Sequence, residues 1–230
     1  MKLSIIMPCY NERETLPKIL EKVRNVKLKN NLKKEIILVD DFSTDGTREY
    51  IKSLDKEIIK LFHEKNKGKG AAIKSGIKKA SGDIIIVQDA DLEYEPNDYN
   101  KLIEPILEGK AEVVYGSRVL NKKNKKYSHL SFLIGGRLVT FVTNLLFFSR
   151  LTDEPTCYKT FKADVIKKIE IEGNRFEWEP EVTAKILKKG IKIHEVPISY
   201  FPRKKSEGKK INWKDGVQAI WTLVKYRVRE

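Results

Sequence analysis

The sequence predicts an α/β fold built around a mostly parallel β-sheet. Apolar runs of strand length alternate with segments of helical period through the first half of the 230-residue chain. The runs are continuously apolar, as expected of strands that helices cover on both faces. Clusters of polar residues and glycine follow directly after these runs, where the strand-to-helix loops belong.

Five strands and four helices are predicted in alternating order. The strands cover residues 3–8, 35–39, 58–63, 83–87 and 113–116, and the helices lie near residues 15–26, 47–54, 71–80 and 98–108. Parallel strands joined in this way end at one edge of the sheet, and ligands of this fold class bind outside that edge. We therefore expect the functional residues directly after the strands.

Two amphipathic helices are expected in the second half. Residues 130–148 are mostly apolar but carry Arg137 near their centre, and four lysines between residues 122 and 126 precede them. A central arginine costs a membrane-spanning helix about 2.5–3.5 kcal/mol, so we favour a helix in the membrane interface. A buried or dimer-forming helix is the alternative. A second basic helix is predicted from the spacing of Trp213, Val217, Ile220, Trp221, Val224 and Val228.

The charge balance indicates anionic partners. The chain has 46 Lys and Arg against 32 Asp and Glu, a formal net charge of +14. Nucleic acid, a membrane surface and phosphorylated small molecules all satisfy this requirement. Two cysteines, Cys9 and Cys157, are too few for a disulfide scaffold, and no zinc-type cluster surrounds them. The first residues lack the apolar core of a signal peptide, so we expect a reduced cytosolic setting.

The strongest chemical signal is Asp89-Ala90-Asp91, followed by Glu93. Carboxylates two residues apart on an extended segment project to one side and can share a divalent cation such as Mg²⁺ or Mn²⁺. Such a cation completes its shell with phosphate oxygens and suits a diphosphate ligand. Helix capping explains Asp45 and Asp98 but not two acids at this spacing.

Other phosphate-binding and nucleophilic motifs are missing from the sequence. The segment that begins at Gly68 lacks the third glycine of a dinucleotide fingerprint, and no P-loop motif occurs. The histidines His63, His129 and His194 are far apart in sequence, so we interpret them as packing or surface residues.

The motifs together resemble the inverting family 2 glycosyltransferases of the GT-A fold, in order and spacing. The resemblance is strongest to the branch of dolichol-phosphate mannose synthases and related polyprenyl-phosphate sugar transferases. It covers residues 4 to about 225 and rests on Met7-Pro8-Cys9-Tyr10-Asn11-Glu12, Leu38-Val39-Asp40-Asp41, Asn66-Lys67-Gly68-Lys69-Gly70, Asp89-Ala90-Asp91, Gly116-Ser117-Arg118, Asp153-Glu154-Pro155-Thr156-Cys157-Tyr158-Lys159 and Phe176-Glu177-Trp178-Glu179-Pro180-Glu181.

This resemblance implies a role for each candidate residue. Residues 1–118 would form the nucleotide-sugar half and residues 119–230 the acceptor half of one catalytic domain. The implied nucleotide-binding residues are Pro8, Tyr10, Asn11, Glu12, Val39, Asp41, Lys69 and Ala90. The implied metal ligands are Asp89, Asp91 and Glu93, where Glu93 replaces a glutamine common in that branch. The implied phosphate and acceptor residues are Arg118, Arg137, Arg203, Lys205 and Lys209, and the catalytic candidates are Asp89, Asp91 and Glu181, with Glu181 preferred over Glu179.

The resulting hypothesis is a peripheral enzyme at the cytosolic membrane face. It would move a hexose from GDP-mannose or a UDP-sugar to dolichyl or polyprenyl phosphate with Mg²⁺ or Mn²⁺. One alternative is a family 2 transferase with a soluble or protein-linked acceptor. Another is a basic nucleic-acid-binding protein, but no RNA-binding signature or aromatic platform accompanies the charge. We therefore interpret the basic surplus as directed to a membrane rather than to nucleic acid.

Overall fold

A seven-stranded sheet forms the centre of the computed structural model, which describes residues 1–124, 130–203 and 213–229. The strand order is β3-β2-β1-β4-β6-β5-β7, and every neighbouring pair is parallel except the two pairs that include β6. The strands are β1 (Lys2–Cys9), β2 (Lys33–Asp40), β3 (Ile59–Phe62), β4 (Ile84–Val87), β5 (Val113–Ser117), β6 (Lys159–Lys162) and β7 (Ile193–Pro197). The predicted α/β class and mostly parallel sheet are confirmed. Strands β6 and β7 were not predicted.

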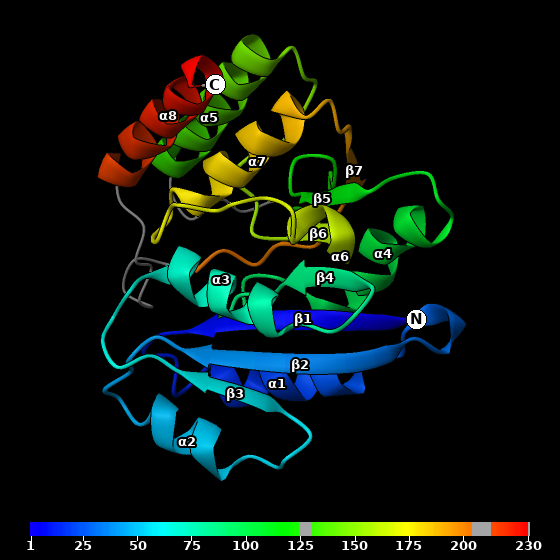
Figure 1. Cartoon of the computed structure of the whole chain (residues 1–230), viewed down its shortest axis with the longest axis vertical. Coiled ribbons are helices and arrows are strands. Elements are labelled where there is room, and N and C mark those ends of the chain that lie inside the picture. Colours follow the sequence, from blue (N-terminus) through cyan, green and yellow to red (C-terminus); the bar gives the residue numbers. More distant parts are fainter. Residues whose placement is uncertain (125–129, 204–212, 230) are drawn as a thin grey trace.

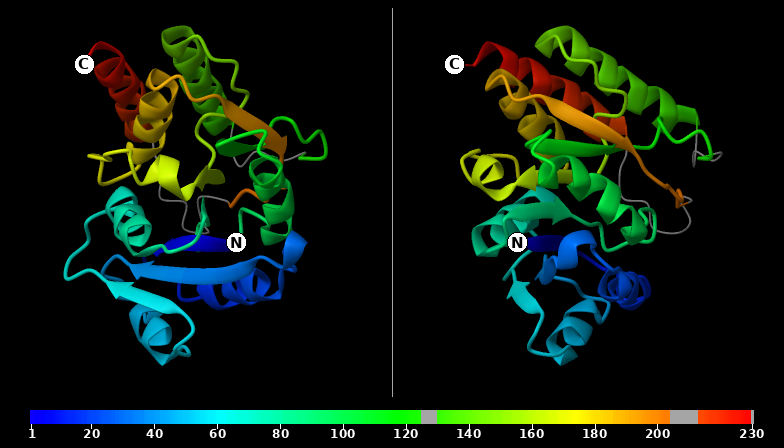
Figure 2. Two further views of the ribbon diagram at one scale, coloured as in Figure 1. Left: turned by 45° about the vertical axis from the view of Figure 1, so that its right-hand side comes forward. Right: turned by 90° about the vertical axis from the view of Figure 1, so that its right-hand side faces the viewer.

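Helices cover both faces of the sheet, with α3 and α6 on one face and α1 and α4 on the other (Figures 1 and 2). The helices are α1 (Leu16–Asn25), α2 (Thr47–Ser53), α3 (Lys69–Lys79), α4 (Tyr99–Leu107), α5 (Leu130–Phe147), α6 (Ala163–Ile166), α7 (Trp178–Lys188) and α8 (Trp213–Val228). The described residues also form two 3₁₀ turns, η1 (Lys29–Asn31) and η2 (Pro96–Asp98).

The core explains why the apolar runs became strands. All four residues of β4 are fully buried, and burial of one such side chain contributes about 1.5–3 kcal/mol. Helix α3 approaches this layer closely, because a Cβ added to Gly76 would lie 2.4 Å from Cγ2 of Ile6. This tight packing holds the first turn of α3 beside the carboxyl edge of the sheet.

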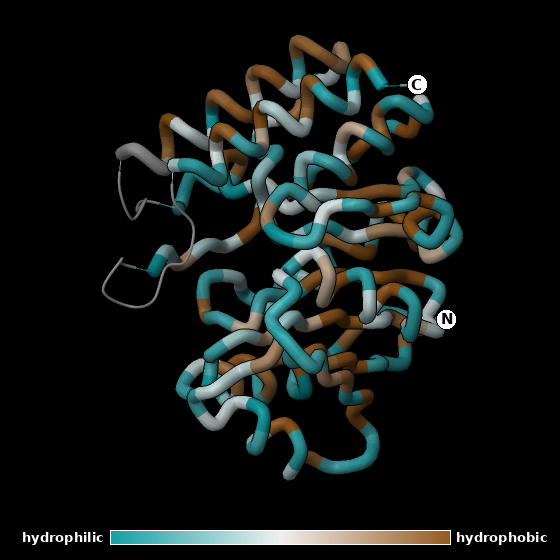
Figure 3. Tube along the Cα trace, turned by 60° about the vertical axis from the view of Figure 1, so that its left-hand side comes forward, coloured by the Kyte–Doolittle hydropathy of each residue, from teal (hydrophilic) through white to brown (hydrophobic). Residues whose placement is uncertain are grey.

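Helices α5, α7 and α8 pack together in a separate layer past the end of the sheet formed by β5 and β7, at the top of Figure 1. Their contact is a small apolar cluster built from Val139, Ala184, Leu223 and Tyr226. The outward side chains of α5 and α8 are apolar as well, with Phe141 and Trp221 each 63% exposed. Brown apolar segments accordingly recur along these outer helices in Figure 3. No helix in the described part of the chain is long and apolar enough to cross a membrane.

Candidate active site

A cavity of about 1220 Å³ lies between the carboxyl edge of the sheet and the layer of α5, α7 and α8. Loops after β1, β2, β4 and β5 contribute polar side chains to its wall, as the strand-end rule predicts. Helices α5 and α8 contribute mainly apolar and small residues, among them Leu133, Gly136, Val139, Val217 and Ile220. The cavity thus has a charged end at the sheet and an apolar end at the outer helices.

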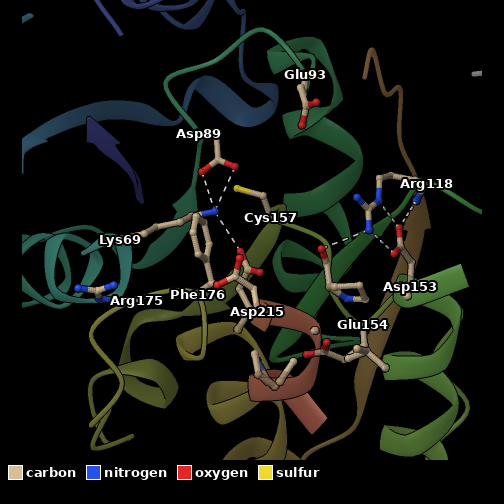
Figure 4. Close-up of a pocket in the computed structure, with 18 of the residues that line it drawn as sticks. Lys69, Asp89, Glu93, Arg118, Asp153, Glu154, Cys157, Arg175, Phe176 and Asp215 are labelled. Atoms are coloured by element: carbon tan, nitrogen blue, oxygen red, sulfur yellow. Dashed lines mark hydrogen bonds and ion pairs between the residues drawn. The ribbon is translucent and has the colours of Figure 1, made fainter. Parts of the chain in front are cut away.

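Asp89, directly beyond β4, is held by Lys69. The Lys69 ammonium lies 2.9 Å from a carboxylate oxygen of Asp89 (Figure 4). It also lies 3.0 Å from a carboxylate oxygen of Glu179 of α7. Burial opposes the charged form of Lys69, but the attraction of its acidic neighbours outweighs burial and raises its pKa well above the usual value. Lys69 is therefore a fixed positive charge in the wall of the cavity.

Asp91 is held by a second cation, Arg203. The guanidinium of Arg203 donates to Asp91 at 3.0 Å and to both carboxylate oxygens of Glu12 at 3.1 and 3.2 Å. Burial, together with the carboxylates of Asp89 and Glu93, raises the pKa of Asp91 to about 7, although Arg203 acts in the opposite direction. Negative charge is therefore in excess at this point of the cavity.

The donor set of Asp89 and Asp91 fits a divalent cation. Mg²⁺ is typically held by one or two carboxylates and keeps water or phosphate oxygens as its other ligands. The raised pKa of Asp91 reflects burial first and then repulsion by Asp89 and Glu93, and a bound cation would offset both effects. Among the described residues, no three His, Cys, Asp or Glu side chains converge on a common point that could hold a metal ion.

Glu93 is therefore not brought into the metal site that the sequence suggested. Its carboxylate accepts a hydrogen bond from the backbone N–H of Arg203 at 2.6 Å and from the hydroxyl of Tyr200 at 3.2 Å. These contacts fasten the segment before Arg203 over the cavity. Glu93 thus makes a positioning contact, and its role in binding a metal stays a prediction.

Asp41, at the end of β2, lines the cavity with its carboxylate already engaged. It accepts from the backbone N–H groups of Lys67 and Gly68 at 2.8 and 2.7 Å, and His63 Nδ1 lies 2.7 Å away. Gly68 has a left-handed φ of +98°, and a Cβ there would lie 2.4 Å from the Asn174 carbonyl oxygen. Only glycine fits this approach. Asp41 thus shapes the loop that carries Lys69.

The other predicted nucleotide-binding residues divide into two groups. Pro8 and Tyr10 line the cavity. Asn11, Glu12, Val39 and Ala90 do not belong to its lining in the described part of the chain. Asn11 accepts from the Thr44 N–H at 2.9 Å and so joins two loops, while Val39 and Ala90 are buried. These four residues support the wall.

Arg118, beyond β5, is directed toward Asp153. Two guanidinium nitrogens donate to the two Asp153 carboxylate oxygens at 2.7 Å each, and the guanidinium stacks 5.1 Å from the Tyr200 ring centre. Such a bidentate pair is charge-assisted and well oriented. Arg137 lines the same cavity from α5 as an exposed side chain. Lys205 and Lys209 lie outside the described residues.

Glu181 is not in the cavity, contrary to the sequence-based preference. Its side chain is fully buried on the other side of α7 and accepts from the backbone N–H groups of Glu172 and Gly173. Residues two apart on a helix point in nearly opposite directions, about 200° apart. Glu179 therefore faces the cavity and contacts Lys69, whereas Glu181 lies outside the cavity lining.

Two partners of the site were missed at the sequence level. His63 holds Asp41, and Asp153 holds Arg118. His63 directly follows β3, so its position at a strand end was an available signal. Asp153 follows no strand, and its pairing with Arg118 across 35 residues depends on the tertiary fold.

Comparisons with known proteins agree with this geometry. Residues 4–170 match the sequence profile described as Glycosyl transferase family 2. The chain is 30% identical over 240 residues to the UDP-N-acetylglucosamine–dolichyl-phosphate N-acetylglucosaminyltransferase of Methanococcus voltae, which covers 96% of this chain and 94% of that protein. It is 33% identical over 215 residues to the dolichol-phosphate mannosyltransferase of Pyrococcus furiosus, covering 91% of this chain and 59% of that protein.

Solved structures show the same fold at lower identity. A crystal structure of glucosyl-3-phosphoglycerate synthase from Mycobacterium tuberculosis in complex with UDP aligns with a TM-score of 0.76 at 17% identity, over 98% of this chain and 80% of that chain. A complex of the same enzyme with Mn²⁺, UDP and phosphoglyceric acid gives 0.74 at 18% identity, over 100% and 79%. The family profile covers most of the chain, and its strand-end acids line the cavity, so this protein belongs to glycosyl transferase family 2.

Proposed function

We propose that this glycosyltransferase moves a hexose from a nucleotide diphosphate sugar, GDP-mannose or a UDP-sugar, to a polyprenyl phosphate such as dolichyl phosphate. The observation that carries the proposal is the two-ended cavity. Its sheet end combines Asp89 and Asp91 with the cations Lys69 and Arg203, and its outer end is apolar. The names of the two relatives from Methanococcus voltae and Pyrococcus furiosus support a lipid phosphate as acceptor.

The charged end suits the donor. Asp89 and Asp91 would hold Mg²⁺ or Mn²⁺, which neutralises charge on a leaving nucleoside diphosphate. Lys69 sits at the first turn of α3, where helix N-terminal N–H groups also favour anions. When a diphosphate is bound, Lys69 exchanges its contact with Asp89 for phosphate oxygens, and its charge is already in place to stabilise them.

The acceptor's chemistry explains why no base is needed. A phosphomonoester has a second pKa of about 6 and is largely dianionic at neutral pH. It can attack without losing a proton, so the chain's task is to hold two anions together. Arg118, Arg137 and Arg203 all line the cavity, where they can screen that repulsion. The absence of Glu181 from the cavity is compatible with this mechanism.

The outer helices suit a membrane surface. Exposed apolar side chains on α5 follow a spacing of three and four residues at Ile134, Leu138, Phe141 and Leu145, and the exposed Phe148 comes directly after the helix. Helix α8, packed against α5, exposes Trp213, Val217, Trp221, Val224 and Val228. This apolar face with nearby basic residues is typical of helices that lie in the membrane interface. Docking there would bring the apolar end of the cavity to the lipid.

A donor and acceptor screen tests the proposed function. Labelled GDP-mannose, UDP-glucose and UDP-N-acetylglucosamine are each incubated with Mn²⁺ and either polyprenyl phosphate or a soluble phosphomonoester, and mass spectrometry identifies the products. We expect a sugar phosphoryl lipid from one donor. A product on the soluble phosphomonoester alone would overturn the lipid assignment.

Membrane docking has its own test. The double variant Phe141→Ser/Trp221→Ser should lose most of its flotation with anionic liposomes. Phe62→Ser is the matched control, because Phe62 is exposed on β3, away from the outer helices. Unchanged flotation of the double variant would contradict the docking face.

A further inference from the structure

Two glutamates hold loops on opposite sides of the cavity with the same geometry. Glu181 of α7 accepts from two consecutive backbone N–H groups, those of Glu172 at 2.7 Å and Gly173 at 2.6 Å. Glu195 of β7 accepts from Thr152 at 2.7 Å and Asp153 at 3.0 Å. A carboxylate that accepts two adjacent N–H groups forms charge-assisted bonds and fixes the orientation of that loop. Neither side chain belongs to the cavity lining.

The loop held by Glu181 supports Lys69. The carbonyl oxygen of Asn174 accepts from the N–H of Ala71 at 2.9 Å, in the first turn of α3. A Cβ added to Gly70 would lie 2.7 Å from the Gly173 carbonyl oxygen. The backbone of α3 at Gly70 therefore packs directly against the backbone of the loop at Gly173, with no space for a side chain. Lys69 stands in this turn. A shift of the loop would move Lys69 relative to Asp89.

The loop held by Glu195 supports Arg118. The backbone N–H of Asp153 donates a hydrogen bond to Glu195. The carboxylate of Asp153 in turn accepts hydrogen bonds from the Arg118 backbone N–H at 2.8 Å and from the Arg118 guanidinium. In the same loop Thr152 Oγ1 lies 2.7 Å from the Ser117 hydroxyl. Figure 4 shows Lys69 and Arg118 entering the cavity from opposite sides, each with its acidic partner. Each cation therefore has a separate support.

We propose that Glu181 and Glu195 are paired positioning residues, Glu181 for Lys69 and Glu195 for Arg118. Through them the enzyme sets two cations independently, one for the diphosphate of the donor and one for the phosphate of the acceptor. The assignment of the two phosphates rests on the proposed function. Glu181 also pairs with Lys185 at 2.6 Å, but Lys185 does not line the cavity. The physical claim is that each glutamate acts on the cavity through only one of its two cations, Lys69 or Arg118.

Crossed double-mutant cycles test this claim. Glu181→Gln and Glu195→Gln preserve side-chain volume but turn an amide NH₂ toward one of the two backbone N–H groups. Each is combined with Lys69→Met and with Arg118→Met. Binding of UDP and of GDP with Mn²⁺ is measured by calorimetry, and the KM for polyprenyl phosphate is measured by transfer.

We expect Glu181→Gln to weaken nucleotide diphosphate binding about fivefold, a coupling typical of residues that share a network. The loss should disappear in the Lys69→Met background and persist in the Arg118→Met background. Glu195→Gln should leave nucleotide binding unchanged and raise the KM for polyprenyl phosphate, and this rise should disappear with Arg118→Met. Additive effects of Glu181→Gln and Lys69→Met would overturn the proposal, as would equal effects of both glutamates on nucleotide binding.

A second variant and a separate binding readout cover the two ways in which this experiment could fail. If Glu181→Gln does not fold, Gly173→Ala disturbs the same contact from the loop, since its Cβ would lie 2.7 Å from Oε2 of Glu181. Its effect must also disappear with Lys69→Met. If the wild type transfers no sugar to polyprenyl phosphate, the acceptor assignment fails. The nucleotide-binding cycle still decides whether Glu181 acts through Lys69.

Discussion

Carboxylates at the two edges of the sheet have pKa values that are shifted in opposite directions. At the amino edge, Glu35 accepts from the Ser4 hydroxyl at 2.5 Å, the Ser81 N–H at 2.8 Å and the Lys2 ammonium at 3.1 Å. Burial opposes its ionisation, but these hydrogen bonds outweigh burial and lower the pKa of Glu35 to about 2. At the carboxyl edge, burial and neighbouring acids raise the pKa of Asp91 to about 7.

The difference lies in the balance of donors and acids. At the amino edge several donors surround one carboxylate, which leaves nothing for a ligand to satisfy. At the carboxyl edge Asp89, Asp91 and Glu93 share the cations Lys69 and Arg203. Excess like charge is destabilising in the folded state and is tolerated where a ligand relieves it. The functional edge is thus the one whose charges are incompletely compensated.

The largest effect should follow from removing one of those charges. Asp91→Asn should lower transfer at least ~10³-fold, because a carboxylate in the metal-binding pair is lost. Without metal, the same variant should have a free energy of unfolding about 1 kcal/mol higher than the wild type and should melt at a higher temperature, since burial of a charged carboxylate and its repulsion with Asp89 and Glu93 are removed. Activity assays and thermal melts with and without Mn²⁺ check both results.

Asp83→Asn is the matched control for Asp91→Asn. Asp83 precedes β4, as Asp91 follows it, and its carboxylate accepts from the Lys2 N–H at 2.7 Å at the amino edge. We expect Asp83→Asn to retain activity and to be slightly less stable than the wild type. If both variants lost stability equally, the contrast between the two edges would be wrong.

Lys69→Met should have the next largest effect. Loss of a fixed charge beside the diphosphate should reduce kcat/KM about 10²-fold. Lys79→Met serves as the control, because Lys79 is exposed at the opposite end of the same helix. Steady-state kinetics with varied nucleotide sugar measure the effect. Equal activity of the two variants would remove Lys69 from the site.

The smallest effect concerns stability at the amino edge. The folded pKa of Glu35 lies below its usual value of 4.5, so its stabilisation is present above that pH and is lost as pH falls toward 2. Glu35→Gln should lower the free energy of unfolding by about 1 kcal/mol at pH 7 and leave activity unchanged. Urea melts should show that the difference in free energy of unfolding between wild type and Glu35→Gln is smaller near pH 3 than at pH 7. A difference that does not change with pH would contradict stabilisation by the ionised form of Glu35.

The parts of the fold that were predictable from the sequence depend on local apolar patterns or on the order of strands and helices. The continuously apolar β4 was recognisable, and the strand-end rule placed Asp41, Lys69, Asp89 and Asp91 at one edge. Strand β6 was missed because it begins with Lys159, which is fully buried and lies 3.7 Å from the equally buried Glu154. A lysine inside a central strand is understandable only with that partner in view.

Two candidate site residues differ from their expected positions for one reason. Spacing along α7 could not decide which of Glu179 and Glu181 faces the cavity, because that depends on how the helix packs against the loop at Glu172 and Gly173. Glu93 similarly follows Asp91 at a spacing suited to metal binding, yet its contacts are with the segment near Arg203. Residue type and spacing identified the acids, and tertiary packing decided their roles.

The most direct test of the central claim is transfer of labelled sugar to polyprenyl phosphate by wild type and Asp91→Asn, side by side, with Mn²⁺ or with chelator. We expect label in the organic phase only for the wild type with metal and lipid phosphate both present. Undiminished transfer by Asp91→Asn, or no transfer by the wild type from any common nucleotide sugar, would contradict it.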